Sequence, residues 1–138
     1  MTKVSDQILQ ILYAHLSVQS ILDMKDNYNE VSIRQLNDMN KNCCASFPIK
    51  VDHRVMAIIF VFDAKEVYNI VVYTCSHFMR EKENCFPQLE KIVKELAEKK
   101  EINAIVYKQA RQILSSLTSV GFNVRKEKEK YIVLEYKK

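Results

Sequence analysis

The feature that most constrains this fold is an apolar stretch over residues 55–75, which is interrupted by one short polar segment. Residues 55–62 read Val-Met-Ala-Ile-Ile-Phe-Val-Phe, and residues 67–75 are again rich in β-branched and aromatic side chains. This composition favours strands, and the intervening residues 63–66 suit a four-residue turn that needs no glycine. Because the first run has almost no polar residue, both of its faces must be covered. The stretch predicts two central strands, at about 54–62 and 67–75, with helices on both sides.

The sequence before this stretch predicts helices and an edge strand. Apolar residues at three- and four-residue spacing predict one long amphipathic helix over residues 4–24, with His15 on its apolar face as a core or boundary residue. Its wide apolar stripe suits packing within the chain, or half of a dimer interface. Ser32 and Gln35 fit a capping box that opens a short helix, and the alternating residues 47–51 predict an edge strand.

The sequence after this stretch predicts one further helix and then leaves two interpretations. Pro87 opens a strong helical pattern over residues 87–100. Next, either Asn103 caps a helix whose apolar stripe covers residues 106–117, or residues 102–107 form a short strand. The single glycine, Gly121, stands where a helix C-cap needs a left-handed residue, so we expect a structural role for it.

The last part of the chain predicts a second antiparallel pair, over residues 122–126 and 131–136, which alternate around a charged turn. Taken together, the patterns predict an α+β fold. Its antiparallel sheet is centred on residues 55–75 and is covered by the helices predicted at 4–24 and 87–100. A length of 138 residues suits one domain over residues 1–138.

Glycine is scarce, with one glycine and two prolines in 138 residues. Neither a P-loop nor a dinucleotide fingerprint can be written with one glycine, so we expect no bound cofactor. No apolar run is long enough to cross a bilayer, and no basic and then apolar leader opens the chain. We therefore expect an intracellular protein, in cytoplasm or nucleus, with reduced cysteines and no membrane partner.

The side chains that carry chemistry do not form a specific motif. A tetrahedral zinc site could be assembled from Cys75, His77, Cys85 and either Cys43 or Cys44. However, no Cys-x-x-Cys pair is present, and cysteines also serve as small apolar residues in protein cores. No pattern joins a cysteine or serine to a particular histidine, and no pair of carboxylates stands out. We therefore predict neither a catalytic residue nor a metal site.

Charge is unevenly spread along the chain. The formal charge is −2 over residues 1–90 and +6 over residues 91–138, within a total of +4. A basic C-terminal third suits an anionic partner, although lysines often only keep a surface solvated. Residues 106–119 and 122–136 resemble the last helix and β-wing of a winged-helix domain. This resemblance implies nucleic-acid binding through six cations, which are Lys108, Arg111, Arg125, Lys126, Lys128 and Lys130.

A second resemblance lies in residues 110–124, a predicted helix ending in Ser-Val-Gly-Phe and followed by a strand. This segment resembles the closing helix and strand of small acetyltransferases, which implies an enzyme that uses acetyl-CoA. The glycine-rich turn of such enzymes is missing here. The sequence thus favours, first, a small non-enzymatic regulatory protein that binds nucleic acid. A protein-interaction module or complex subunit, with a homodimer through residues 4–24, comes second, and an acyltransferase-like enzyme third.

Overall fold

The two central strands predicted from residues 55–75 form the middle of a six-stranded sheet. The computed structural model describes residues 2–24 and 33–137. Strands β2 (Arg54–Ala64) and β3 (Val67–Thr74) pair antiparallel, and β2 is buried along most of its length. The turn between them is shorter than predicted, because Ala64 still pairs with Val67. Lys65 takes a positive φ of 67° there, and its N–H donates to Asp63 Oδ1 (3.1 Å).

The sheet has the strand order β1-β2-β3-β4-β6-β5. Its other strands are β1 (Ala45–Val51), β4 (Glu101–Tyr107), β5 (Phe122–Glu127) and β6 (Tyr131–Tyr136). Strand β1 is an edge strand, as predicted for residues 47–51. The prediction of an antiparallel sheet is wrong at one point, because β3 and β4 are parallel while all other neighbours are antiparallel. A helical crossover joins β3 to β4, and such a crossover returns the chain in the same direction.

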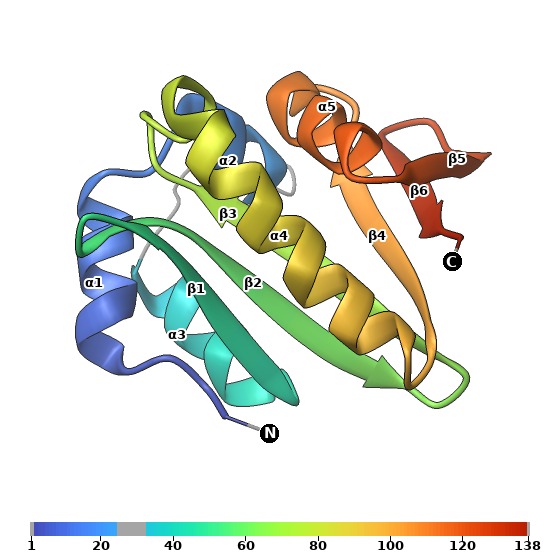
Figure 1. The fold of residues 1–138 in the computed structure, drawn as a ribbon, viewed down its shortest axis with the longest axis horizontal. Coiled ribbons are helices and arrows are strands. Elements are labelled where there is room, and N and C mark those ends of the chain that lie inside the picture. Colours follow the sequence, from blue (N-terminus) through green and yellow to red (C-terminus); the bar gives the residue numbers. More distant parts are fainter. Residues whose placement is uncertain (1, 25–32, 138) are drawn as a thin grey trace.

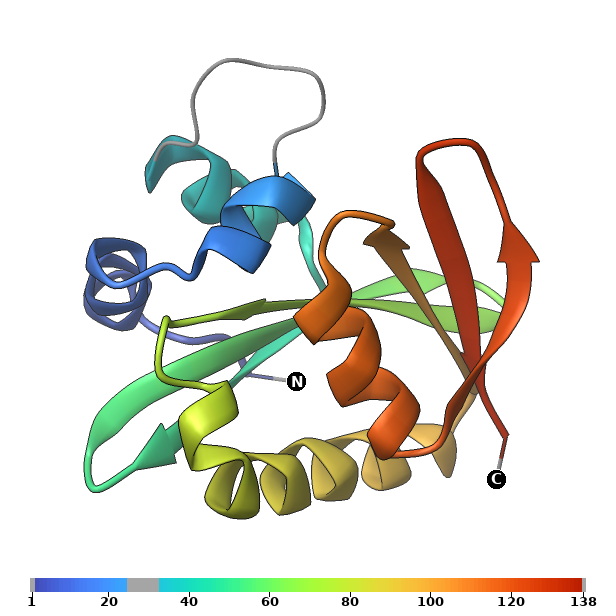
Figure 2. The same ribbon diagram turned by 90° about the horizontal axis from the view of Figure 1, so that it is seen from above.

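Helices cover both faces of the sheet (Figure 2). One face carries α1 (Asp6–Ala14), α2 (Val18–Met24) and α3 (Ile33–Asn42), and the other carries α4 (Lys82–Ala97) and α5 (Arg111–Ser119). Leu9 and Leu12 of α1 pack into the core on one side, and Leu89 and Val93 of α4 do so on the other. Helices therefore bury both faces of β2, as its apolar sequence requires. No helix in the described part of the chain is long and apolar enough to span a bilayer.

The single helix predicted over residues 4–24 is wrong, because residues 15–17 separate α1 from α2. These residues run alongside the end of β3: Leu16 forms a β-bridge with Cys75, and the Ser76 N–H donates to the His15 carbonyl (3.0 Å). Long-range pairing therefore overrides the local helical pattern. His15, predicted as a core or boundary residue, is the C-cap of α1 and is exposed, so it does not lie in the core. The Ser32 half of the predicted capping box lies outside the described residues.

In the C-terminal half, the strand interpretation of residues 102–107 is confirmed by β4, and the helix capped by Asn103 is wrong. Helix α4 begins five residues before Pro87, preceded by a short 3-10 helix, η1 (Met79–Glu81). Gly121 follows α5 with a φ of 117°, and a Cβ there would lie 2.9 Å from Tyr136 Cε1. Its structural role is therefore confirmed, because both the backbone angle and the close ring favour glycine.

The winged-helix pattern predicted for the C-terminus is wrong, although its hairpin exists. Strand β6 pairs with β4 along its whole length, so β5 and β6 form one edge of the central sheet. A hairpin continuous with a six-stranded sheet is not a wing that projects beside a recognition helix. The observed hairpin instead completes one edge of the central sheet.

Candidate functional site

The parallel pair β3–β4 is hydrogen-bonded at one end only. Pairing ends at Ile70 opposite Ala104, so residues 71–74 of β3 and 105–107 of β4 are not paired with each other. Each strand stays paired with its other neighbour, and the two carboxyl ends therefore separate (Figure 1). We call this wedge the splay. Ligands of α/β sheets bind beyond the carboxyl ends of parallel strands, which makes the splay the first candidate site.

Helix α2 occupies the hydrogen-bonding edge of β3 inside the splay. The Thr74 N–H donates to Ser20 Oγ (2.6 Å), and the Thr74 carbonyl accepts from the Ser17 N–H (2.9 Å) and the Ser20 hydroxyl (3.2 Å). The Ser17 hydroxyl also lies 2.9 Å from the Thr74 hydroxyl. All three residues are buried, and we call them the serine latch. The latch satisfies the polar backbone groups that would otherwise need a β4 partner.

The same helix supports the start of α5 on the far side of the splay. Ala110, the N-cap of α5, provides no side-chain hydrogen bond. Instead the Gln112 N–H donates to Gln19 Oε1 of α2 (3.0 Å). A helix start needs such an acceptor for its unpaired N–H groups. Helix α2 therefore bridges the splay, from the end of β3 to the start of α5.

Beyond the end of β3, the chain turns through residues 75–78 into η1 and α4. This helical start carries two exposed cations, Arg80 and Lys82. The N-terminus of a helix also holds a partial positive charge and unpaired N–H groups. Glu81 lies in the same turn and pairs with Arg54 of β2 (3.8 Å). A second acid, Glu83, is exposed in the first turn of α4, so this helical start offers two cations and unpaired N–H groups to an anion beside two carboxylates.

The gap between η1 and α5 is narrow. The Ser116 hydroxyl of α5 lies 3.4 Å from the Met79 sulfur, although its main hydrogen bond goes to the Gln112 carbonyl (2.7 Å). Met79 is half-buried and unbranched, and methionine side chains adapt readily to a new neighbour. The contact therefore joins α5 to η1, just after the carboxyl end of β3, through an adaptable side chain.

A pocket of about 320 Å³ opens beside the same end of β3. It lies between α1, the β1–β2 turn and the segment after β3. The lining residues are Ile11, His15, His53, Arg54, Val55, Met56, Cys75 and His77. Since the chain contains three histidines, this pocket gathers all of them. We call it the histidine pocket.

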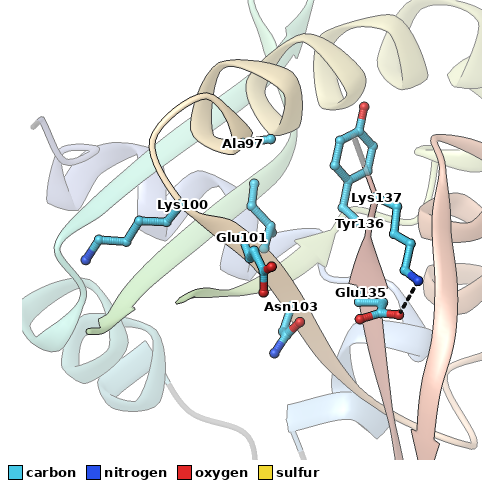
Figure 3. Close-up of a pocket in the computed structure, with 8 residues that line it drawn as sticks. Ala97, Lys100, Glu101, Asn103, Glu135, Tyr136 and Lys137 are labelled. Atoms are coloured by element: carbon cyan, nitrogen blue, oxygen red, sulfur yellow. Dashed lines mark ion pairs between the residues drawn. The ribbon is translucent and has the colours of Figure 1, made fainter. Parts of the chain in front are cut away.

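A different hollow, of about 370 Å³, lies at the opposite end of β4 (Figure 3). Three of its four charged lining residues, Lys100, Glu135 and Lys137, form ion pairs with one another or with a neighbour. Lys137 pairs with Glu135 (3.5 Å), and Lys100 points away from that pair toward its partner Asp63. Exposed pairs of this kind are typical of a solvated surface. The hollow therefore offers no convergent set of groups for a ligand.

The cysteines behave as apolar side chains. All four are free thiols, and only Cys44 is partly exposed. Burial raises the pKa of Cys85 to about 11, with Cys75 and Glu81 adding to the effect, and burial also raises the pKa of Cys43. Such thiols stay protonated at neutral pH and are poor nucleophiles. Among the described residues, no three His, Cys, Asp or Glu side chains are arranged to hold a metal ion.

The six cations predicted to bind nucleic acid lie around the C-terminal hairpin and the start of α5. Lys108 pairs with Glu127 (3.0 Å), and the Arg125 guanidinium lies beside the Asn103 amide. Lys126 and Lys128 come together, and the Lys128 ammonium lowers the pKa of Lys126. The other two predicted cations are both exposed, Arg111 at the first turn of α5 and Lys130 at the hairpin turn.

The sequence matches no protein-family model and no curated protein. Its fold, however, matches solved structures along nearly the whole chain. The PaiA N-acetyltransferase from Thermoplasma acidophilum, solved with coenzyme A, has a TM-score of 0.68 at 15% identity, covering 98% of this chain and 96% of that chain. The GNAT domain of S. lividans PAT has a TM-score of 0.72 at 9% identity, covering 95% and 84%. The fold is that of the GNAT acetyltransferases.

The Escherichia coli ribosomal-protein-S18-alanine N-acetyltransferase has the same fold, with a TM-score of 0.67 at 11% identity, covering 96% and 89%. These matches overturn the leading prediction from the sequence. A non-enzymatic, DNA-binding regulatory protein is wrong, because the acetyltransferase fold accounts for the helix α5 and the hairpin that suggested a winged helix. The resemblance placed third, over residues 110–124, corresponds to α5 and β5 of this fold.

The sequence reasoning missed the groups that line the splay and the histidine pocket. One signal pointed to the splay: a strand, a helix and a second strand over residues 67–107 form a β-α-β unit, which implies a parallel pair. No local signal marked Ser17 and Ser20, because serines within a helical pattern are ordinary. Nor did the sequence indicate that His15, His53 and His77 line the same pocket.

Proposed function

We propose that this protein is an acyl-CoA-dependent acetyltransferase whose thioester substrate enters the splay. The observation that carries the proposal is the one-ended pairing of β3 and β4, beneath two helix starts and within an acetyltransferase fold. A wedge between two parallel strands exposes backbone N–H and C=O groups of β3 to an extended ligand. A coenzyme A arm, which carries amides of its own, has the chemistry to pair with them.

The residues fit coenzyme A at its phosphate end. Arg80 and Lys82 stand at the start of the η1–α4 helix, where cations and a helix N-terminus together favour a diphosphate. No glycine-rich turn precedes this helix. The side chains at its start would therefore hold the phosphates more than the backbone of a loop would. Arg80 and Lys82 are therefore the residues that we assign to phosphate binding.

The edge of β3 can accommodate the thioester end of acyl-CoA only after the hydrogen bonds of the serine latch break. Ser17 and Ser20 already bond both polar groups of the Thr74 backbone. An acyl chain that pairs with this edge must displace them, and their hydrogen bonds then have to be replaced by the ligand. The affinity for acyl-CoA is therefore reduced by the latch, as for any ligand that binds a minor conformation.

An acyl-CoA supplies a thioester: an amine nitrogen forms a bond to the acyl carbon, the carbon–sulfur bond breaks, and coenzyme A leaves as a thiol with the proton lost by the amine. The protein's own contribution is to orient the acceptor amine and to keep water from the reacting carbon. Val72 and Val106, both buried next to the splay, provide an apolar wall for this purpose.

The proposal is tested by titrating acetyl-CoA into the purified protein by calorimetry, followed by mass spectrometry of amines incubated with both. We expect saturable binding, and transfer of one acetyl group to an amine. The charge reversals Arg80→Glu and Lys82→Glu should each weaken binding about tenfold or more, because each removes a charged phosphate contact.

The matched control is Lys91→Glu, which reverses an exposed charge in the middle of the same helix α4. Its affinity for acetyl-CoA should be unchanged. If neither the wild type nor Ser20→Ala binds acetyl-CoA at millimolar concentration, the proposal is wrong.

The expectation of a homodimer or protein partner through residues 4–24 stays a prediction. Helices α1 and α2 leave part of their apolar surface uncovered, with Val18 at 69% exposure, Ile11 at 43% and Ile21 at 37%. Light scattering of the protein over a range of concentrations tests it. A monomer at all concentrations would remove the homodimer, and Val18→Lys should favour the monomer if the dimer exists.

A further inference from the structure

The histidine pocket brings together side chains from three distant parts of the chain. His15 ends α1, His53 stands in the β1–β2 turn, and His77 follows β3. The pocket holds every histidine in a chain of 138 residues, and all three are exposed to solvent at its rim. Imidazole groups at such a rim are hydrogen-bond donors in either protonation state.

The charge of this pocket is one-sided. Arg54 is its only lining residue with a permanent charge, and none of its eight lining residues is an Asp or a Glu. Glu81 approaches Arg54 at 3.8 Å, a distance that leaves most of the guanidinium donors available. The Arg54 side chain is 59% exposed, so it can reorient toward a ligand. A cationic ligand has no counter-charge here, whereas an anion meets a guanidinium and three imidazoles.

The turn that presents His53 is built at a conformational cost. Val51 pairs with Arg54, which leaves a two-residue turn in which Asp52 and His53 have positive φ values of 51° and 68°. Turns of this type favour Asn and Gly at both central positions. A histidine in the left-handed region places its imidazole at the pocket where a glycine would have placed nothing. Strain of this kind is found where a side chain is needed at a binding site.

The pocket adjoins the splay through the same two segments. Residues 15–17 run antiparallel to residues 74–76, and this short pairing carries the serine latch at one end. His15 and His77 flank its other end. A molecule in the pocket therefore lies next to the edge of β3 that the proposed acyl chain would use.

We infer that the histidine pocket binds an oxyanion, a carboxylate or a phosphate, through Arg54 and its three imidazoles. A further consequence follows, and it rests on the proposed function. The bound oxyanion is the acidic group of the amine that accepts the acetyl group. The acceptor is then an amine that carries a carboxylate or phosphate, such as an amino acid or a phosphoamine. A polyamine does not fit, because the pocket lining offers it no carboxylate.

The oxyanion site is tested without coenzyme A. Inorganic phosphate and, in a separate series, succinate are titrated into ¹⁵N-labelled full-length protein at constant ionic strength, and the imidazole signals are followed by NMR. We expect the signals of all three histidines to shift along one saturable curve with at least one of the two probes. The probe that saturates at lower concentration decides between a phosphate and a carboxylate.

Two variants should weaken that binding. Arg54→Gln removes the permanent charge, and His53→Asn keeps a residue that tolerates the left-handed turn. Each should raise the dissociation constant about tenfold, because each removes a charged or directed hydrogen bond. Lys91→Gln, which removes an exposed cation of α4 outside the pocket, serves as the control and should leave the constant unchanged. Shifts that do not saturate, or that both pocket variants leave unaltered, would overturn the inference.

The acceptor assignment has a separate readout. Acetylation of O-phosphoethanolamine and glutamate is compared with that of ethanolamine and putrescine. We expect the two anionic amines to be preferred, and Arg54→Gln to raise their KM more than it lowers kcat. Phosphate or succinate binding without any transfer would keep the oxyanion site and overturn the acceptor assignment. Transfer that prefers putrescine would overturn that assignment while leaving the acetyltransferase proposal intact.

Discussion

The two ends of the β3–β4 pair differ although the same two strands form both. At the amino end, backbone hydrogen bonds close the sheet, and nearby charges such as Lys100 and Asp63 pair on the surface. At the carboxyl end, the ladder stops after Ile70, and side chains of α2 satisfy the backbone instead. Side chains can move aside for a ligand, whereas a continuous ladder cannot. The difference explains why one end of a rigid sheet can serve as a binding site.

The largest expected effect comes from Ile70→Ala, at the last paired residue of the closed end. Ile70 is fully buried, so the variant should lose about 2–5 kcal/mol of unfolding free energy through lost burial and the cavity left behind. Ile105→Ala, on the separated part of β4 and 40% exposed, is the matched control and should lose far less. Urea denaturation measures both. Equal losses would mean that the burial of Ile70 does not contribute to the stability of the paired end.

The next effect tests the serine latch. Ser20→Ala leaves the buried Thr74 N–H without its acceptor, which should cost about 1–3 kcal/mol of unfolding free energy. The same change frees the edge of β3, so we expect tighter binding of acetyl-CoA by calorimetry. Ser46→Ala is the control: its hydroxyl is also buried and also bonded, to Asn40 Oδ1 (2.6 Å), but it lies on β1. It should lose similar stability without any gain in affinity.

Thiol labelling gives a third, smaller contrast between the two ends. Cys44, near the closed end, is half-buried and should react with a disulfide reagent in the native protein, whereas Cys75 and Cys85 should react only on unfolding. The pKa of Cys85 is raised to about 11, so its contribution to stability is complete below the ordinary thiol range and is lost as the pH rises toward 11. Cys85→Ala should flatten this alkaline decline in unfolding experiments. Rapid native labelling of Cys85 would show that the carboxyl end opens without a ligand.

The smallest effect is expected from the surface pair at the closed end. The Lys100 hydrogen bond lowers the pKa of the Asp63 carboxyl, so the stability it contributes is present above the ordinary Asp pKa and is lost as the pH falls below it. Because the Asp63 carboxylate is exposed and the Lys100 side chain is only partly buried, Asp63→Asn should change stability only slightly, and salt should weaken the difference. Thermal denaturation of the variant and wild type at two pH values checks this. A large, salt-independent loss of stability would mean that the ion pair stabilises the amino end of the β3–β4 pair as much as its backbone hydrogen bonds do.

Local patterns predicted the elements well where a single face decides the structure. The apolar run of β2, the amphipathic pattern of α4 and the single glycine after α5 each carry their information within a few residues. The sequence failed where two segments far apart compete with a local pattern. Residues 15–17 continue a helical period, yet they pair with the end of β3, and Ser17 lies 57 residues from its partner Thr74.

The sequence by itself determined a buried strand pair, helices on both sides of it and a glycine-poor chain without a phosphate loop. The tertiary structure alone decided that β3 and β4 are parallel, that their carboxyl ends separate, and that all three histidines line one pocket beside the end of β3. The physical reason is that these features depend on interactions between residues far apart in the sequence. Side-chain periodicity reports which face of an element is buried, but strand direction, register and the meeting of distant side chains depend on how whole elements pack.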